Sequence, residues 1–236
     1  MIPSPAGPSC LGFLPVPSAR VTVSLESGAE GRWTNRGGSR AVVCMNGGTA
    51  AEHSGTWSAS LEWLVGRLAR RRPELGFLEV RYRIKSWRRL ELCVEDAGAA
   101  IAAARASGAD EVALIGFSMG GAVAVHVAAD PAVSTVIALA PWLYPELDLA
   151  PLEGRRFALV HGSLDRALPG LPGVRPELSL RGYDRARALG IDAVRTVIPG
   201  ALHPIALRAP WGEPVRMPKA ERWEELVDAE LGRFCA

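Results

Sequence analysis

Residues 113–127 read ALIGFSMGGAVAVHV: an apolar run, a serine held between glycines, and a second apolar run. The central residues match G-x-S-x-G, a pattern in which a serine stands on a sharp turn between a strand and a helix. A match alone is a weak signal, because glycine and serine are common residues. The alternative is that Ser118 only fills a small gap at a tight turn. The flanking residues have to decide between the two.

The flanking residues favour a strand, a turn and a helix in direct succession. A buried strand is predicted over 111–115 and an Ala/Val-rich helix over about 119–129. Gly116 and Gly120 have no Cβ, which lets the strand and the helix approach closely. Such a turn lifts the hydroxyl of Ser118 above the sheet, beside helix N–H groups that favour negative charge. We therefore predict that Ser118 is a nucleophile.

The rest of the chain alternates predicted strands and helices. Continuously apolar strands between helices indicate a mostly parallel sheet covered on both faces. We predict one doubly wound α/β domain over 20–236, entered by an edge hairpin and preceded by a Pro-rich arm over 1–19. Further strands are predicted over 40–45, 76–82, 133–140, 155–162 and 192–200, and the last of these is the last strand of the chain. Further helices are predicted over 57–73, 88–108, 178–190 and 219–234. Trp57 is expected on the buried face of the helix over 57–73.

Composition sets outer limits on function. The chain has 236 residues, 48% of them hydrophobic, which is enough for a substantial core. A net charge of +2 is too small to indicate a nucleic-acid partner. No secretory signal or membrane-spanning run is apparent. The four cysteines show no metal-binding or disulfide pattern, so we expect reduced thiols in the cytoplasm (Cys10, Cys44, Cys93 and Cys235).

A nucleophilic serine needs a histidine to take its proton. His203, just after the last predicted strand, is the best candidate for this base. We expect His126, inside the motif helix, and His161, at a strand end, to be structural. His53 falls near the expected pocket mouth, where a binding role is left open.

An acid must in turn orient the histidine. Asp165, four residues beyond a buried strand, lies at the same sheet edge and between Ser118 and His203 in sequence. The alternative is a turn aspartate that bonds its own backbone. Glu146 and Asp148, after the preceding strand, are reserve candidates. We predict that Asp165 is the acid.

Two backbone N–H groups are needed to stabilise an oxyanion. Met119, directly after the nucleophile, is placed to supply one. The segment MNGGTA, residues 45–50, follows a predicted strand, and its paired glycines suit the second donor. Gly48 is the first choice and Thr49 the second, while a plain Gly-Gly turn remains the alternative.

Three aromatic residues are candidates to line a substrate pocket beside Thr49: Trp57, Trp142 and Tyr144. Ordinary packing explains each of them equally well. Residues 167–178 are rich in proline and glycine and suit a stiff rim. A basic cluster follows another strand end, and it could attract an acidic substrate. We favour the alternative, in which these side chains lie in solvent at the start of a helix and are balanced by nearby acidic residues. The basic residues are Arg81, Arg83, Lys85, Arg88 and Arg89, and the acidic residues are Glu91, Glu95 and Asp96.

Together GFSMGG, HGSLD and GALH, each after a predicted strand, resemble the α/β-hydrolase superfamily, specifically its small, cap-less dienelactone-hydrolase-like or esterase-like members. Asn46 stands where a histidine is common in the oxyanion motif of that superfamily. The resemblance implies a doubly wound fold without a separate cap domain, and a triad of Ser118, Asp165 and His203.

The function expected from this resemblance is hydrolysis of a carboxylic ester, thioester or lactone through an acyl-enzyme. The partner would be a small acyl substrate, and no cofactor or metal is required. An acyl transferase or cyclase using the same triad is one alternative, and a non-catalytic binding protein on the same fold is another. The natural substrate and the oligomeric state are left open.

Overall fold

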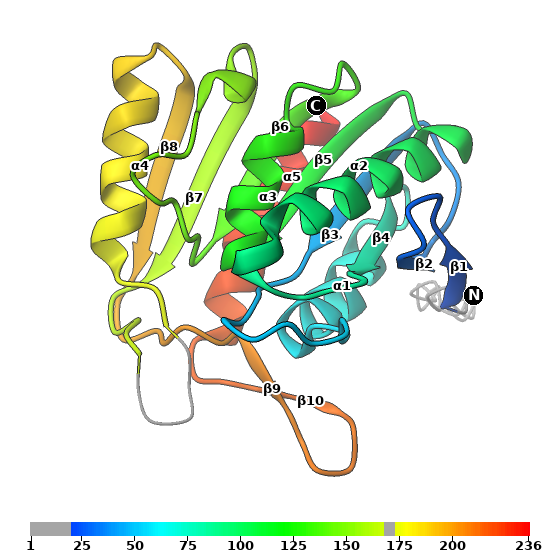
Figure 1. Ribbon diagram of the computed structural model, residues 1–236, viewed down its shortest axis with the longest axis horizontal. Coiled ribbons are helices and arrows are strands. Elements are labelled where there is room, and N and C mark those ends of the chain that lie inside the picture. The colour runs from blue at the N-terminus through cyan, green and yellow to red at the C-terminus, as the bar shows by residue number, and fades with distance from the viewer. Residues whose placement is uncertain (1–19, 168–172) are drawn as a thin grey trace, which may run out of the picture.

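The protein is built around an eight-stranded sheet. The computed structural model describes residues 20–167 and 173–236, and its strands lie in the order β1-β2-β4-β3-β5-β6-β7-β8 (Figure 1). Strands β3 to β8 run parallel, while the β1–β2 hairpin is antiparallel and joins β4 in antiparallel fashion. The strands are β1 (Val21–Ser24), β2 (Glu30–Thr34), β3 (Arg40–Met45), β4 (Gly76–Arg81), β5 (Glu111–Phe117), β6 (Val133–Leu139), β7 (Arg156–Gly162) and β8 (Asp192–Ile198).

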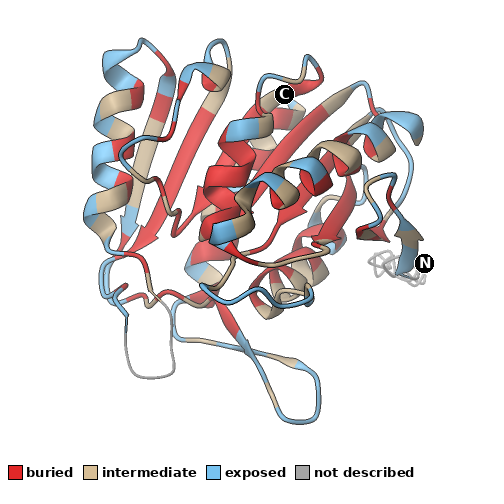
Figure 2. Ribbon diagram, in the orientation of Figure 1, coloured by how far each residue is buried: buried red, intermediate tan, exposed pale blue. Residues whose placement is uncertain are grey.

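The central strands are apolar along their whole length because both faces of the sheet are buried. In β5, Val112 and Leu114 enter one core, while Ala113 and Ile115 enter the other. Successive side chains of a strand point to opposite faces, so a continuous apolar run supplies two cores at once. The buried residues follow these strands in Figure 2.

Helices cover both faces. Helices α1 and α5 pack on one core, and α2, α3 and α4 pack on the other (Figure 1). The prediction of a doubly wound α/β fold is therefore confirmed. The helices are α1 (Ala59–Arg71), α2 (Leu90–Ala106), α3 (Met119–Val127), α4 (Pro176–Ala188) and α5 (Ala220–Cys235), with short 3-10 turns η1 (Trp87–Arg89) and η2 (Ala150–Leu152).

Two sequence expectations about this fold are wrong. Trp57 is not on a helix, because α1 starts only after Ser58, whose side chain caps the helix by accepting from the N–H of Leu61. Strand β8 is not the last strand, since a small antiparallel hairpin follows it, β9 (Ala206–Arg208) with β10 (Pro214–Arg216). Exposed residues in both short strands hide the alternating pattern that marks a strand.

The carboxyl ends of the parallel strands meet at one edge of the sheet. Strand β6 ends at Leu139 and β7 begins at Arg156, and the connection between them holds only η2, so no separate cap is inserted there. Across the described ranges, no helix has the length and apolar character needed to cross a membrane. The arm predicted over 1–19, with Cys10, lies outside the described residues.

Candidate active site

Ser118 stands on a sharp turn between β5 and α3. Its backbone angles are φ 56° and ψ −118°, a conformation that residues with a Cβ rarely adopt. The turn is fixed by its own backbone groups. The N–H of Ser118 donates to the carbonyl of Leu139 at 2.9 Å, and the Ser118 carbonyl accepts from Trp142 at 2.9 Å and from Gly121 at 3.0 Å. Hydrogen bonds to the end of β6 and to the loop after it thus hold a strained turn in place.

Glycines are required at this turn by space. A Cβ on Gly116 would lie 2.2 Å from the carbonyl oxygen of Gly120, and a Cβ on Gly120 would lie 2.2 Å from that of Met45. Both contacts are with backbone, which cannot rotate away as a side chain can. The G-x-S-x-G pattern therefore reflects the close packing of α3 against β5 and β3.

Asp165 lies beyond the end of β7 and binds His203, which lies beyond the end of β8. The Nδ1 atom of His203 is 2.7 Å from Oδ2 of Asp165, and both side chains are buried. The other carboxylate oxygen, Oδ1, accepts a hydrogen bond from the N–H of Val174 at 2.9 Å. Because the carboxylate of Asp165 can only accept a hydrogen bond, a neutral His203 carries its proton on Nδ1, and its Nε2 atom is left as an acceptor.

His161 is a second histidine on the same carboxylate. Its Nε2 atom lies 2.9 Å from Oδ2 of Asp165 and 2.9 Å from the carbonyl oxygen of Val174. Both neighbours are acceptors, so Nε2 carries the proton. Burial by itself would raise the pKa of Asp165, but the hydrogen bonds from His161 and His203 outweigh it and hold that pKa below its ordinary value.

The loop that carries His203 is fastened to the start of α1. The hydroxyl of Ser60 accepts from the N–H of Ile205 at 3.1 Å and from that of Ala206 at 3.2 Å. The ring of Phe117, next to the serine, lies 5.0 Å from the imidazole of His203. Ser60 and Phe117 therefore restrict where the imidazole can lie.

The loop after β3 runs alongside Ser118. The Asn46 side chain accepts from the N–H of Gly47 at 2.7 Å and donates to the carbonyl of Thr56 at 3.0 Å. The N–H of Thr49 donates to the Lys85 carbonyl at 3.3 Å. Among the described residues, no hydrogen-bond acceptor is found for the N–H of Gly48. Gly48 therefore remains a candidate oxyanion donor, whereas Thr49 is already engaged.

Close packing explains the paired glycines of this loop. A Cβ on Gly48 would lie 2.2 Å from Sδ of Met119, and one on Gly47 would lie 3.1 Å from Cβ of Ser118. Neither glycine has a positive φ. Glycine is therefore needed here for its small size, because the loop presses against the turn that bears Ser118.

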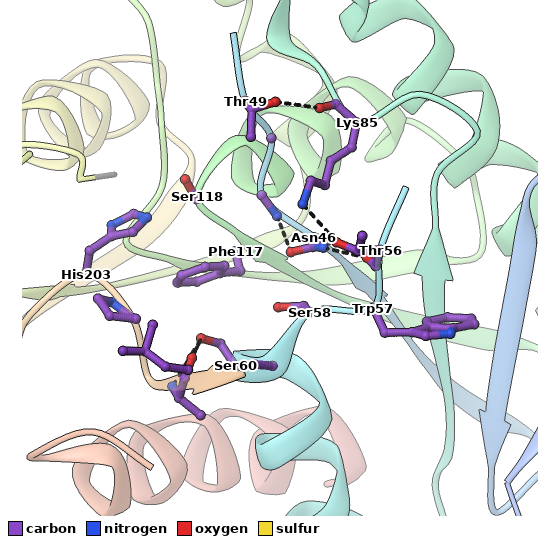
Figure 3. Close-up of a pocket in the computed structure, with 16 residues that line it drawn as sticks. Asn46, Thr49, Thr56, Trp57, Ser58, Ser60, Lys85, Phe117, Ser118 and His203 are labelled. Atoms are coloured by element: carbon purple, nitrogen blue, oxygen red, sulfur yellow. Dashed lines mark hydrogen bonds between the residues drawn. The ribbon is translucent and has the colours of Figure 1, made fainter. Parts of the chain in front are cut away.

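Two cavities meet at Ser118. One, of about 250 Å³, is also lined by His203, Gly48, Thr49 and Lys85 (Figure 3). The other, of about 420 Å³, lies between Trp87 and Trp142 and is lined by Met119 and Val174 as well. The first wall combines polar and apolar groups and includes the charged side chain of Lys85, whereas the second wall is mostly apolar. We call them the polar cavity and the apolar cavity.

Comparison with known proteins assigns the chain to a family. Residues 42–231 match the model of the alpha/beta hydrolase family, which is most of the chain. The chain belongs to the alpha/beta hydrolase family. A comparison with curated proteins finds no match.

Solved structures agree with this alpha/beta hydrolase in fold. A Pyrococcus furiosus esterase superposes with a TM-score of 0.64 at 16% identity, covering 91% of this chain and 90% of its own. A dienelactone hydrolase-like promiscuous phosphotriesterase from metagenomic libraries gives 0.64 at 16%, covering 90% and 96%. A lid-less serine hydrolase from Xanthomonas campestris gives 0.55 at 18%, covering 81% and 88%. At these identities the likeness shows the fold alone.

The pocket candidates of this hydrolase are only partly brought together. Trp57 and Thr49 line the polar cavity, and Trp142 lines the apolar one. Tyr144 lines neither cavity; its ring packs on Trp142 with centroids 4.8 Å apart, and its hydroxyl is 3.0 Å from Nε2 of His126. Of the rim expected over 167–178, residues 168–172 lie outside the described part, while Ala167, Gly173 and Val174 do line the apolar cavity.

The other acid and histidine candidates lie elsewhere. Asp148 accepts from the N–H of Ala150 at 2.9 Å, as a turn aspartate does, and Glu146 is exposed. His126 is exposed rather than part of the core, and His53 is exposed and lines neither of the two cavities. Asp165 is therefore the acid that meets His203.

Most of the basic cluster in this hydrolase is neutralised by carboxylates, as the balanced reading predicted. The ion pairs are Arg81 with Glu30, Arg83 with Glu95 and Asp96, and Arg89 with Glu91 and Glu52. Lys85 differs, since it lines the polar cavity and its Nζ donates to Oγ1 of Thr56 at 2.9 Å. Sequence alone does not distinguish Lys85 from its neighbours.

The cysteines in the described part of the chain form neither a disulfide nor a metal site. Cys44, Cys93 and Cys235 are free thiols, and burial raises the pKa of Cys93 to about 12. Within the described ranges, no three His, Cys, Asp or Glu side chains gather in a way that would hold a metal ion.

Proposed function

We propose that this protein is a serine hydrolase that cleaves a carboxylic ester, thioester or lactone of a small molecule through an acyl-enzyme. The observation that carries the proposal is the placement of His203: it is bound to buried Asp165 at 2.7 Å and shares a cavity with Ser118. With Nδ1 bound to Asp165, Nε2 is the ring nitrogen that would take the proton of the Ser118 hydroxyl. Family membership supports hydrolysis and does not favour the transferase, cyclase or binding-protein alternatives.

In the acylation step, the Ser118 hydroxyl attacks the carbonyl carbon and its proton passes to Nε2 of His203. The carbonyl π electrons move to oxygen, and the N–H groups of Gly48 and Met119 stabilise the resulting oxyanion. When the intermediate collapses, the bond to the leaving group breaks and that group takes the proton from His203. Asp165 stabilises the imidazolium while it exists.

In the deacylation step, water attacks the acyl-enzyme and gives its proton to Nε2 of His203. A second tetrahedral intermediate then collapses, releasing the carboxylic acid and returning the proton to Ser118. The same residues serve both half-reactions, because His203 alternates between base and acid.

A cytoplasmic location of the protein remains a prediction.

A fluorophosphonate probe tests the proposal directly. We expect one covalent adduct, located on Ser118 by peptide mass spectrometry, and none in Ser118→Ala. Turnover of p-nitrophenyl esters should fall by about a thousandfold or more in that variant. Ser54→Ala, at an exposed serine outside both cavities, is the control and should label normally. An adduct that persists in Ser118→Ala would contradict the proposal.

A further inference from the structure

Lys85 is the charged side chain of the polar cavity. Apart from His203, the residues that line this cavity in the described part of the chain carry no ionisable side chain other than that of Lys85. No carboxylate of the described residues lies within ion-pair distance of its ammonium group. An ammonium group beside a reactive serine, without a counter-ion, is an incomplete site for an anion.

The position of Lys85 is fixed by the loop that faces it. Its N–H donates to the carbonyl of His53 at 2.8 Å, and its carbonyl accepts from the N–H of Thr49. Its Nζ donates to the hydroxyl of Thr56, which points the ammonium group into the cavity (Figure 3). Burial lowers the pKa of Lys85, so the ammonium group has already lost part of its hydration. An anion bound there would replace the lost water.

The reaction geometry indicates which part of a substrate reaches Lys85. His203 has to pass its proton to the leaving group, and His203 lines the polar cavity but not the apolar one. The leaving group therefore lies on the side of Lys85. The cavity between Trp87 and Trp142 is left for the acyl chain, which its apolar wall suits.

We propose that Lys85 binds a carboxylate carried by the leaving group, so that the substrates are apolar acyl esters of small hydroxy acids. This inference rests on the proposed function and names its substrate class. One ammonium group and the neighbouring Thr56 hydroxyl match a single negative charge, whereas a phosphate dianion would remain partly unneutralised.

Three small esters test the proposal. Butanoyl glycolate carries its charge on the leaving group, the butanoyl ester of glycolamide is its neutral counterpart, and monoethyl glutarate carries its charge on the acyl side. We expect kcat/KM for the glycolate ester to exceed that for the glycolamide ester by about tenfold or more, and high salt to reduce this ratio. Monoethyl glutarate should be the poorest substrate.

Variants assign the preference to a residue. Lys85→Gln should bring the glycolate ester down to the level of the glycolamide ester, and Lys85→Glu should reverse the order. The glycolamide ester reports whether the site is intact in each variant. Arg88→Gln removes the same charge from an exposed side chain that lines neither cavity, and should keep the wild-type preference.

Several outcomes would overturn the inference. Equal kcat/KM for the two butanoyl esters in the wild type would do so without any variant. A preference that survives Lys85→Gln, or a preference for monoethyl glutarate, would do so as well. In each of these cases labelling of Ser118 and turnover of neutral esters would leave the proposed function standing. Loss of labelling and of all ester turnover would reject both.

Discussion

The imidazole of His161 donates a hydrogen bond to Oδ2 of Asp165 over 2.9 Å, to the same oxygen that His203 contacts. This carboxylate is therefore shared, and the second bond comes from a side chain that is fully buried. The sharing helps to keep Asp165 ionised and in one rotamer. His161 is thus a positioning residue, since it acts on the proposed base only through Asp165.

Loss of this bond should be visible in the pH profile. In His161→Leu the pKa of Asp165 should rise, because one of the hydrogen bonds that opposes the effect of burial is gone. Activity on the acidic side should then disappear at a higher pH than in the wild type. We also expect kcat to fall by about tenfold with KM little changed, measured on p-nitrophenyl butyrate from pH 4 to 9.

The conservative variant separates positioning from packing. The side-chain amide of glutamine can donate near the place of Nε2, so His161→Gln should recover much of the wild-type pH profile. A variant His161→Leu with lower thermal stability but an unchanged pH profile would show that His161 only fills space.

A second prediction concerns Glu62 in α1, whose carboxylate forms ion pairs with three arginines. Its carboxylate contacts Arg208 at 2.8 Å, Arg20 at 2.8 Å and Arg32 at 3.2 Å. Burial alone would raise the pKa of Glu62, but the hydrogen bond from Arg208 and the charge of Arg32 outweigh it and lower the pKa to about 2. The ionised form is therefore favoured by folding.

The stability from Glu62 should depend on pH in a defined direction. Because the native pKa lies below the unfolded value of 4.5, the contribution is complete above that value and is lost as the pH falls towards about 2. Glu62→Gln should lower the melting temperature by a few degrees at pH 7 and by progressively less below pH 4.5. Glu225→Gln, at an exposed pair with Arg222, is the control and should have little effect. A deficit in Glu62→Gln that persists unchanged at pH 2 would contradict the assignment.

Backbone strain at Ser118 gives a third prediction. Glycine adopts positive φ freely, whereas alanine keeps the strain of serine at φ 56°. Ser118→Gly should therefore be more stable than Ser118→Ala by roughly 1 kcal/mol, although both lack the hydroxyl. Thermal unfolding of the two variants measures this difference. A less stable glycine variant would show that the turn is not strained in solution.

A fourth prediction compares two helical glycines. Gly120→Ala would place its Cβ against the backbone of Met45 and should destabilise the protein by about 3 kcal/mol. Gly98→Ala, in α2, meets no atom within 4 Å and should stabilise it by about 0.5–1 kcal/mol. Denaturant unfolding measures both. Similar effects at the two sites would contradict the role of close packing at Gly120.

The meeting of Asp165 and His203 is predictable from sequence because each lies in the loop that follows a predicted parallel strand. Parallel strands end at the same edge of the sheet, so chain order alone places such residues near one another. Trp57 and Tyr144 were harder. The cap at Ser58 starts α1 after Trp57, and the ring of Tyr144 turns towards His126, neither of which follows from hydrophobic periodicity.

Sequence by itself determined the doubly wound fold, the turn at Ser118 and the placement of Asp165 and His203 at one sheet edge, because apolar patterning and glycine positions are local signals. Only the tertiary structure decided that His161 shares the carboxylate, that Thr49 is engaged by Lys85, and that Lys85 alone of its cluster lines a cavity beside Ser118. Such pairings depend on which side chains from distant segments reach the same place, and a distance between segments is a property of the packed chain.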